Sequence, residues 1–188
     1  MKPVHAIAAM CENNGIGRNG GLPWKLKKEM DYFTRMTSST KDSSNRNAVI
    51  MGRKTWESIP NKYKPLANRL NVVVSKQMSD DKEMICFKSV TDAVKTLQSS
   101  HSNYSNIETI WVIGGYNVYK EALDNQLCDK LFLTRIKKEF ECDVFFPEFS
   151  EHDYQLVQQE DVSQEVQIEN SIEYYFQVHE KKTKLMVP

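Results

Sequence analysis

The sequence predicts an α/β fold: a mostly parallel central sheet flanked by helices, with an antiparallel C-terminal edge. Two observations predict this class. From residue 4 to residue 136, short apolar segments alternate with helical ones, which is typical of parallel sheets. After that, YQLVQQE (154–160) and IEYYFQVHE (172–180) alternate in strand fashion with no helix between them, so we expect them to run antiparallel. Residues 1–188 are expected to form a single domain.

Apolar runs of strand length predict the earlier strands in order. These are residues 4–10, 47–52, 69–75, 84–87, 108–115 and 129–136. The helices expected between them are 24–36, which Pro23 can open, 53–59, 91–99 with Thr91 as N-cap, and 116–123. Polar or glycine-rich composition predicts loops at 12–24, 37–47 and 99–106.

Composition excludes several classes of function. The chain has no formal net charge, which does not favour binding to nucleic acid or to a membrane surface. Its longest apolar runs are strand-sized, so no segment is expected to span a bilayer. The four cysteines are far apart, which is typical of reduced thiols in a cytoplasmic protein. No histidine pair has metal-ligand spacing, so no metal site is expected.

Glu29 interrupts the apolar face of the first predicted helix. At about 100° per residue, it falls among Leu26, Phe33 and Met36. A buried carboxylate without a partner is costly, so this position needs an explanation. Either a hydroxyl or an arginine elsewhere in the core satisfies Glu29, or the carboxylate handles a proton or recognises a cation in a pocket. The pattern alone leaves both interpretations open.

Glycine and polar residues follow the strands directly, where α/β sheets bind ligands. Residues 52–55, Gly-Arg-Lys-Thr, form either an anion site or a solvated basic turn. Gly114-Gly115 forms either a tight turn or, as we favour, a close backbone approach to a phosphate. Ser75-Lys76 follows a third strand. The recurrence indicates an anionic ligand such as a dinucleotide.

Residues 15–20 spell G-x-G-x-x-G after the first strand, the fingerprint of dinucleotide-binding folds. In that fingerprint a helix opens within the glycines and an acid ends the next strand. Here Gly21-Leu22-Pro23 intervenes, and the next strand ends in Gly52-Arg53. We therefore interpret the segment as a mobile lid loop.

Segments spread along the chain resemble dihydrofolate reductase. In family order they are IAAM, NNGIGRNGGLPW, KEMDYF, VIMGRKTWESIP, PLANRLNVVVS, IWVIGGYNVYKEAL, LFLTRI and CDVFFPE. They extend from about residue 4 to about residue 180, and GLPW, MGRKTWESIP and the apolar strand ending in Gly-Gly are specific in combination. The resemblance implies a dihydrofolate reductase-like fold and hydride transfer from NADPH to the pterin of 7,8-dihydrofolate, with protonation at N5. The product, 5,6,7,8-tetrahydrofolate, would serve one-carbon metabolism and nucleotide synthesis. The resemblance also implies binding of antifolate inhibitors. We expect a cytoplasmic protein, and a monomer because no second domain is fused to the first.

The resemblance assigns the substrate site. Glu29 would bind the amidine edge of the pterin and promote protonation, Thr134 would bond to Glu29, Trp24 would hold a nearby water, and Leu22 would close over the rings. Arg69 would pair with the α-carboxylate of the glutamate tail. Further contacts would come from Ile7, Ala8, Met30, Phe33, Ser58, Ile59, Tyr63, Leu66, Ile113 and Tyr119.

The resemblance also assigns the cofactor site. Its residues would be Ala9, Ile16, Gly17, Gly20, Gly21, Leu22, Gly52, Arg53, Lys54, Thr55, Ser75, Lys76, Ile113, Gly114, Gly115, Tyr116, Asn117, Val118 and Tyr119. Arg53, Ser75 and Lys76 would receive the 2′-phosphate, and the missing acid after the second strand agrees with NADPH. Cis peptide bonds are expected at Gly114-Gly115 and Lys64-Pro65.

Three positions depart from the common family pattern. Met30 stands where many members carry phenylalanine, Tyr63 stands where many carry a polar residue, and Lys76 replaces a common arginine. Two alternative functions remain beside the reductase: a catalytically silent binding protein on the same scaffold, and a reductase for another pterin or a pyrimidine. The joint presence of Glu29, Leu22, Trp24, Thr134 and Arg69 argues against the silent binding protein. Arg69 argues for a substrate with a glutamate carboxylate and so against the second alternative.

Overall fold

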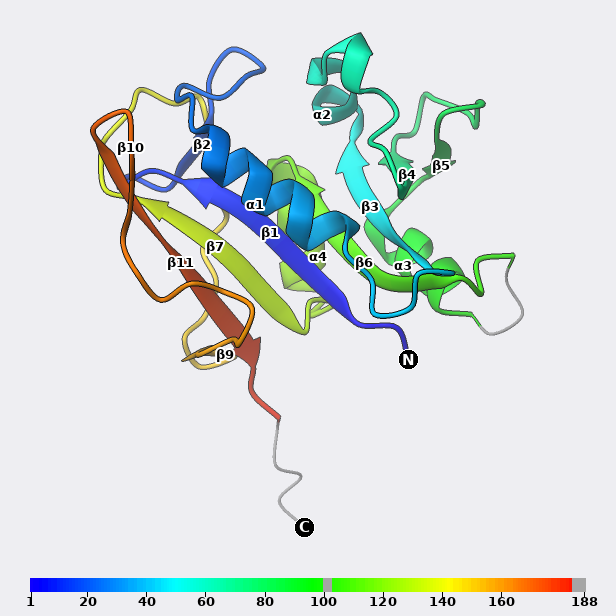
Figure 1. Ribbon diagram of the computed structural model, residues 1–188. Coiled ribbons are helices and arrows are strands. Elements are labelled where there is room, and N and C mark those ends of the chain that lie inside the picture. Colours follow the sequence, from blue (N-terminus) through cyan, green and yellow to red (C-terminus); the bar gives the residue numbers. More distant parts are fainter. Residues whose placement is uncertain (100–102, 184–188) are drawn as a thin grey trace.

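The computed structural model describes residues 1–99 and 103–183, so residues 100–102 of the predicted 99–106 loop lie outside it. The described residues form a twisted nine-stranded sheet (Figure 1). In spatial order its strands are β10 (Gln167–Glu169), β11 (Ile172–Lys181), β7 (Lys130–Ile136), β1 (Val4–Met10), β6 (Ile107–Gly114), β3 (Arg46–Gly52), β4 (Arg69–Val74) and β5 (Ile85–Phe87). The ninth, β9 (Tyr154–Val157), pairs with the second half of β11.

The six strands from β7 to β5 are parallel, whereas β11 runs antiparallel to β7, β9 and β10. The prediction of a mostly parallel sheet with an antiparallel C-terminal edge is therefore confirmed. The central strands are buried on both faces, and residues 48–51 of β3 are fully inaccessible. This burial explains why these strands are continuously apolar in sequence.

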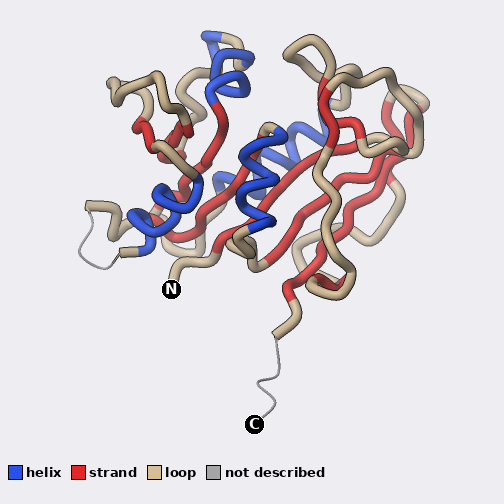
Figure 2. The backbone as a smooth tube through the Cα atoms, turned by 180° about the vertical axis from the view of Figure 1, so that it is seen from behind, coloured by secondary structure: helices blue, strands red, loops and turns tan. Residues whose placement is uncertain are grey.

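Helices cover both faces of the sheet. On one face lie α1 (Lys27–Ser38) and α2 (Arg53–Ser58), whose Tyr32, Met36 and Trp56 pack into one hydrophobic cluster with Val49 and Phe132. On the opposite face lie α3 (Val90–Gln98) and α4 (Tyr116–Asp124), which pack into a second cluster (Figure 2). A short 3₁₀ helix, η1 (Asn61–Tyr63), follows α2. No helix among the described residues has the length and apolarity needed to cross a membrane.

Two predicted helix starts are wrong. The first helix begins at Lys27 rather than directly after Pro23, and its N-cap residue, Leu26, provides no capping side chain. The third begins at Val90 with Ser89 as N-cap, since the Ser89 hydroxyl accepts a hydrogen bond from the Asp92 amide at 3.0 Å. Ser89 and Thr91 are both competent caps by chemistry, and only backbone geometry separates them.

The predicted 12–24 loop is partly ordered into a strand. Within it, β2 (Gly15–Gly17) pairs antiparallel with β8 (Val144–Phe145) in a separate two-stranded sheet. Segments this short show no alternation, so periodicity could not reveal them. The pairing brings residues 141–145 against the loop that precedes α1.

Candidate active site

Glu29 lies in the first turn of α1 and is 5% exposed. The Thr134 hydroxyl on β7 donates a hydrogen bond of 2.9 Å to Glu29 Oε1, and among the described residues this is the only hydrogen bond to the carboxylate. No cation among them lies within ion-pair distance. Burial raises the pKa of Glu29 to about 7, the Thr134 bond lowers it, and the nearby charge of Glu169 raises it. The site thus holds an acid that titrates near neutral pH.

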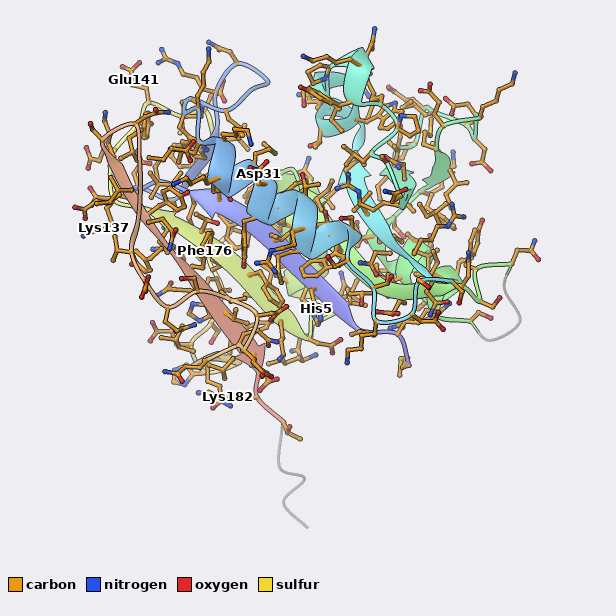
Figure 3. The ribbon with its side chains drawn as sticks, in the orientation of Figure 1. His5, Asp31, Lys137, Glu141, Phe176 and Lys182 are labelled. Atoms are coloured by element: carbon orange, nitrogen blue, oxygen red, sulfur yellow. The ribbon has the colours of Figure 1, made fainter. Side chains whose placement is uncertain are left out.

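Tyr32 and Phe176 fix α1 on the sheet at this site. The Tyr32 ring of α1 stacks on Phe176 of β11 with 3.9 Å between ring centroids. Figure 3 labels Phe176 on the sheet beneath the helix. Asp31, labelled in the same view, lies on the exposed side of α1 and pairs with Lys27 at 2.7 Å. The apolar face thus turns to the sheet and carries Glu29 with it, as the helical pattern predicted.

Trp24 is buried beside the acid-bearing helix. Its ring is 5% exposed, packs edge-on against Phe140 at 5.5 Å, and joins Leu26, Ile136 and Tyr174 in a third hydrophobic cluster. The indole Nε1 has no hydrogen-bond partner among the described residues. A buried donor normally finds an acceptor, so Trp24 offers a hydrogen bond to a water or a ligand.

Arg69 lies at the start of β4 and is 9% exposed. Its guanidinium donates to the Thr37 hydroxyl of α1 at 2.8 Å and to the Ala67 carbonyl at 3.0 Å. The Thr37 hydroxyl in turn donates to the Phe33 carbonyl at 2.8 Å. Arg69 forms no ion pair among the described residues, and burial lowers its pKa. A buried guanidinium without a counter-ion is suited to bind a carboxylate.

The apolar residues expected around the substrate divide into three groups. Ile7 belongs to the hydrophobic cluster under α1, and four half-buried residues pack against the same cluster: Phe33, Ile59, Leu66 and Ile113. Met30, Leu22 and Tyr63 are 45%, 48% and 57% exposed, respectively. Ala8 instead belongs to the cluster on the opposite face of the sheet, so its side chain does not join the other apolar residues.

Two further expected substrate residues bond to the backbone. The Tyr119 hydroxyl of α4 donates to the Ile7 carbonyl at 2.6 Å, which ties the helix after Gly114-Gly115 to β1. The exposed Ser58 hydroxyl donates to the Thr55 carbonyl at 2.7 Å within α2. Tyr119 therefore supports β1 from the protein interior, whereas the Ser58 side chain lies on the exposed surface of α2.

The expected cofactor residues meet where β3 and β6 end. Met51 and Gly114 are partners in the register of these strands. A Cβ on Gly115 would lie 3.4 Å from the Thr55 hydroxyl, and one on Gly52 would lie 3.3 Å from Val118. Gly114 has φ +113°, and the bonds Gly114-Gly115 and Lys64-Pro65 are both cis, as expected. Only small residues allow α2 and α4 to start this close together.

Basic residues surround these helix starts. Arg53 pairs with Glu57 at 2.8 Å on the surface of α2, beside the exposed Lys54. Ser75 lines a surface pocket of about 410 Å³ together with Phe87 and Lys88. Lys88 Nζ also donates to the carbonyl of Lys76 at 3.3 Å, a contact that the sequence did not reveal because Lys88 follows a different strand. Among the described residues no three metal-ligand side chains gather into a metal site.

Residues 18–21, in the loop interpreted above as a lid, form a tight hairpin that is bonded to the 141–145 loop. Arg18 and Gly21 exchange two backbone hydrogen bonds of 2.9 Å around Asn19 and Gly20, which both have positive φ. Asp143 accepts from the Asn19 amide at 2.8 Å, and its own amide donates to the Gly17 carbonyl at 3.0 Å. Glu141, labelled in Figure 3, pairs with Arg18 at 2.6 Å. No sequence signal indicated Asp143, since its partner lies 124 residues away.

Glycines at the ends of neighbouring parallel strands, with helices starting directly after them, are typical of α/β proteins that bind a nucleotide outside the carboxyl ends of their strands. The family follows from comparison. A family model described as Dihydrofolate reductase matches residues 3–181. Because this match spans nearly all of the chain, the chain belongs to the dihydrofolate reductase family.

Relatives and a solved structure agree with this membership. The dihydrofolate reductase of Heliothis virescens is 44% identical over 183 residues, covering 95% of this chain and 97% of that protein. That of Aedes albopictus is 43% identical over 188 residues, covering 98% and 100%. The structure of Schistosoma mansoni dihydrofolate reductase matches with a TM-score of 0.83 and 35% identity, covering 96% of this chain and 99% of that one. The protein is therefore an NADPH-dependent oxidoreductase that reduces dihydrofolate to tetrahydrofolate.

Proposed function

We propose that dihydrofolate lies along α1, with its pterin ring at Glu29 and its glutamate tail at Arg69. The supporting observation is a buried carboxyl and a buried guanidinium that both lack ion-pair partners among the described residues. Glu29 lies at one end of the helix, and Thr37, which holds Arg69, lies two turns later. At a rise of ~1.5 Å per residue these positions are roughly 12 Å apart. A molecule with a nitrogen-rich ring at one end and a carboxylate at the other satisfies both charges.

Glu29 acts on the ring in two ways. Its carboxylate accepts hydrogen bonds from the amidine edge of the pterin, a paired geometry stronger than a neutral contact. It also promotes proton delivery to N5 through water, because its raised pKa lets it share a proton near neutral pH. Thr134 holds one carboxylate oxygen, and the Trp24 indole holds the water.

The apolar residues enclose the rings between these ends. Ile7, Phe33, Ile59, Leu66 and Ile113 form the walls, since they pack against a common cluster. The exposed Met30 and Leu22 become covered when the rings bind and the lid closes. Burial of these side chains adds affinity, and closure excludes water from the reacting atoms.

The residues at the strand ends fit NADPH. The cofactor supplies the hydride. Residues 114–119 approach its phosphates closely, because Gly52, Gly114 and Gly115 carry no side chains at a junction where a Cβ would already touch Val118, Tyr119 or Thr55. Arg53, Lys54 and Thr55 bind the phosphates from α2. Ser75 and Lys76, together with Arg53, bind the 2′-phosphate. Ala9, Ile16, Gly17, Gly20 and Gly21 contact the nicotinamide half.

We further propose a cytoplasmic monomer that folds as one domain and binds antifolate inhibitors in the substrate site. All four cysteines are free, including Cys11 and Cys142, whose sulfur atoms are 3.8 Å apart. Unbonded thiols at this separation are suited to a reducing compartment.

Glu29→Gln tests the assignment of the acid. We expect the variant to fold normally but to lose most of its turnover at pH 7, because Gln cannot assist protonation. Acidification should restore part of the rate, since solvent can then protonate the substrate. The measurement is NADPH oxidation followed by absorbance from pH 5 to pH 8. Asp31→Asn, on the exposed side of α1, is the matched control. Wild-type activity of Glu29→Gln at pH 7 would contradict the role.

A further inference from the structure

Helix α1 lacks a cap of its own at the end that carries Glu29. Leu26 occupies the N-cap position and has no side-chain acceptor. The Lys27 amide instead donates to Glu169 Oε1 at 2.6 Å, and the Lys28 amide donates to Glu169 Oε2 at 2.9 Å. One carboxylate from a segment more than 140 positions away thus satisfies two of the amides left open at the helix start.

The β10–β11 hairpin places this carboxylate. Glu169 is the last residue of β10 and pairs with Ile172 across the turn. The turn residues Asn170 and Ser171 both have positive φ, as the tightest hairpin turns require. The Asn170 side chain donates to the Lys25 carbonyl at 2.9 Å, and the Tyr174 hydroxyl contacts Glu169 Oε2 at 3.4 Å. In Figure 1 this turn lies at the same end of the sheet as the start of α1.

We propose that Glu169 is a positioning residue for the reductase reaction, holding the first turn of α1 so that the Glu29 carboxyl stays aligned with the bound ring. The inference rests on the role proposed for Glu29. Two physical effects carry it. The two hydrogen bonds fix the backbone on which Glu29 stands. The negative charge also opposes the positive end of the helix dipole, which otherwise favours the ionised form of an acid in the first turn.

The other groups facing Glu29 do not supply this charge. Thr134 of β7 donates a hydrogen bond, which favours the carboxylate. Tyr32 of α1, Tyr119 of α4 and Tyr174 of β11 interact electrostatically with Glu29, but burial raises the pKa of each, so they are neutral at pH 7. Burial is the largest cause of the raised pKa of Glu29, and Glu169 of β10 is the anionic group that adds to it. Its loss should favour ionisation of Glu29.

Glu169→Gln tests the proposal, because it removes the charge and keeps one acceptor for the helix amides. Two quantities are followed from pH 5 to pH 9. The first is the titration of the Glu29 carboxyl by carbon NMR of the unliganded protein. The second is the rate of hydride transfer in a single turnover. We expect both midpoints to move to lower pH by a few tenths of a unit, the size of a helix-terminus charge effect. The KM for dihydrofolate at pH 7 should stay close to that of the wild type.

Two variants serve as controls. Glu165→Gln removes an exposed carboxylate from the same segment, and its side chain makes no hydrogen bond or ion pair among the described residues, so it should shift neither midpoint. Glu169→Asp retains the charge on a shorter side chain, so its midpoints should return toward those of the wild type even if the thermal midpoint falls.

Unchanged Glu29 titration in Glu169→Gln would overturn the proposal, as would an equal shift in Glu165→Gln. A shifted Glu29 titration with an unmoved rate profile would support the link between Glu169 and Glu29. The unmoved rate profile would at the same time contradict the catalytic role proposed for Glu29. Failure of the role of Glu169 and failure of the role of Glu29 are therefore distinguishable.

Discussion

At the scale of single residues, Glu29 shows how much a sequence pattern can and cannot provide. A charge among apolar positions of a helix marked the residue, and the structure confirms that it is buried. The pattern left open whether a partner or a ligand site explains it. The structure supplies a single hydroxyl, Thr134, from a strand more than 100 positions away. One neutral donor does not satisfy a buried carboxylate, so the ligand interpretation gains support.

The raised pKa of Glu29 predicts a pH-dependent stability. The folded protein holds this proton up to about pH 7, whereas an unfolded glutamate releases it near its ordinary value of 4.5. The contribution of this bound proton to the free energy of unfolding is therefore complete below pH 4.5. It is lost as the pH rises to 7, by up to ~3 kcal/mol. Glu29→Gln lacks this loss, so its stability relative to the wild type should rise between pH 5 and pH 8.

Urea unfolding of both unliganded proteins across this range measures the difference. Asp31→Asn, which removes an exposed carboxylate from the same helix, should show no such trend. A constant difference between Glu29→Gln and the wild type would show that Glu29 is ionised in the folded protein throughout.

The basic residues at the strand ends carry a second prediction at this scale. Combining Arg53→Ala with Lys76→Ala removes the charges assigned to the 2′-phosphate, so the preference for NADPH over NADH should fall at least ~tenfold, as expected for charged hydrogen bonds. The ratio of kcat/KM for the two cofactors measures it. Lys182→Ala, directly after the end of β11, is the control for loss of a surface cation (Figure 3). An unaltered ratio would place the phosphate elsewhere.

At the scale of elements, strands were easier to predict than helix starts and short pairings. The buried strands are apolar on both faces, so their sequences identify them without reference to neighbours. The start of α1 was misplaced because its capping group, Glu169, comes from β10 rather than from the adjacent sequence. The β2–β8 pairing was missed for a similar reason, since its two short segments depend on each other.

The contact between Asp143 and the lid hairpin predicts an effect on catalysis with little effect on stability. Asp143→Ala removes the acceptor for the Asn19 amide, an exposed bond worth about 1 kcal/mol. The lid should then close less completely, so the hydride-transfer rate should fall several-fold while the thermal midpoint moves by only a few degrees. Stopped-flow measurement of NADPH oxidation gives the rate.

Glu139→Ala is the matched control for this variant. Its side chain is exposed and makes no hydrogen bond or ion pair among the described residues, although it lies in the same loop. A hydride-transfer rate in Asp143→Ala equal to that of Glu139→Ala would show that the contact does not govern closure.

At the scale of the whole molecule, the sheet order explains why distant residues form one site. Strands β3 and β6 are neighbours although more than 50 residues separate them, so Gly52 and Gly114-Gly115 meet at their ends. Helix α1 crosses this sheet with Thr134 of β7 near its start, and with Arg69 of β4 bonded near its end. Alternation of strands and helices predicted the parallel sheet. It could not give the strand order, which depends on packing between segments far apart in sequence.

The central claim is that the two buried charges along α1 bind the two ends of one substrate. The most direct test measures the dissociation constants of dihydrofolate and of a 7,8-dihydropterin without the glutamate tail, in the wild type, Arg69→Leu and Glu29→Gln. Arg69→Leu should weaken dihydrofolate binding at least ~tenfold, the value of a charge-assisted pair, and leave the tail-less ring unaffected. Glu29→Gln should weaken both ligands by a similar factor. Equal losses for both ligands in Arg69→Leu, or no loss for either, would contradict the account.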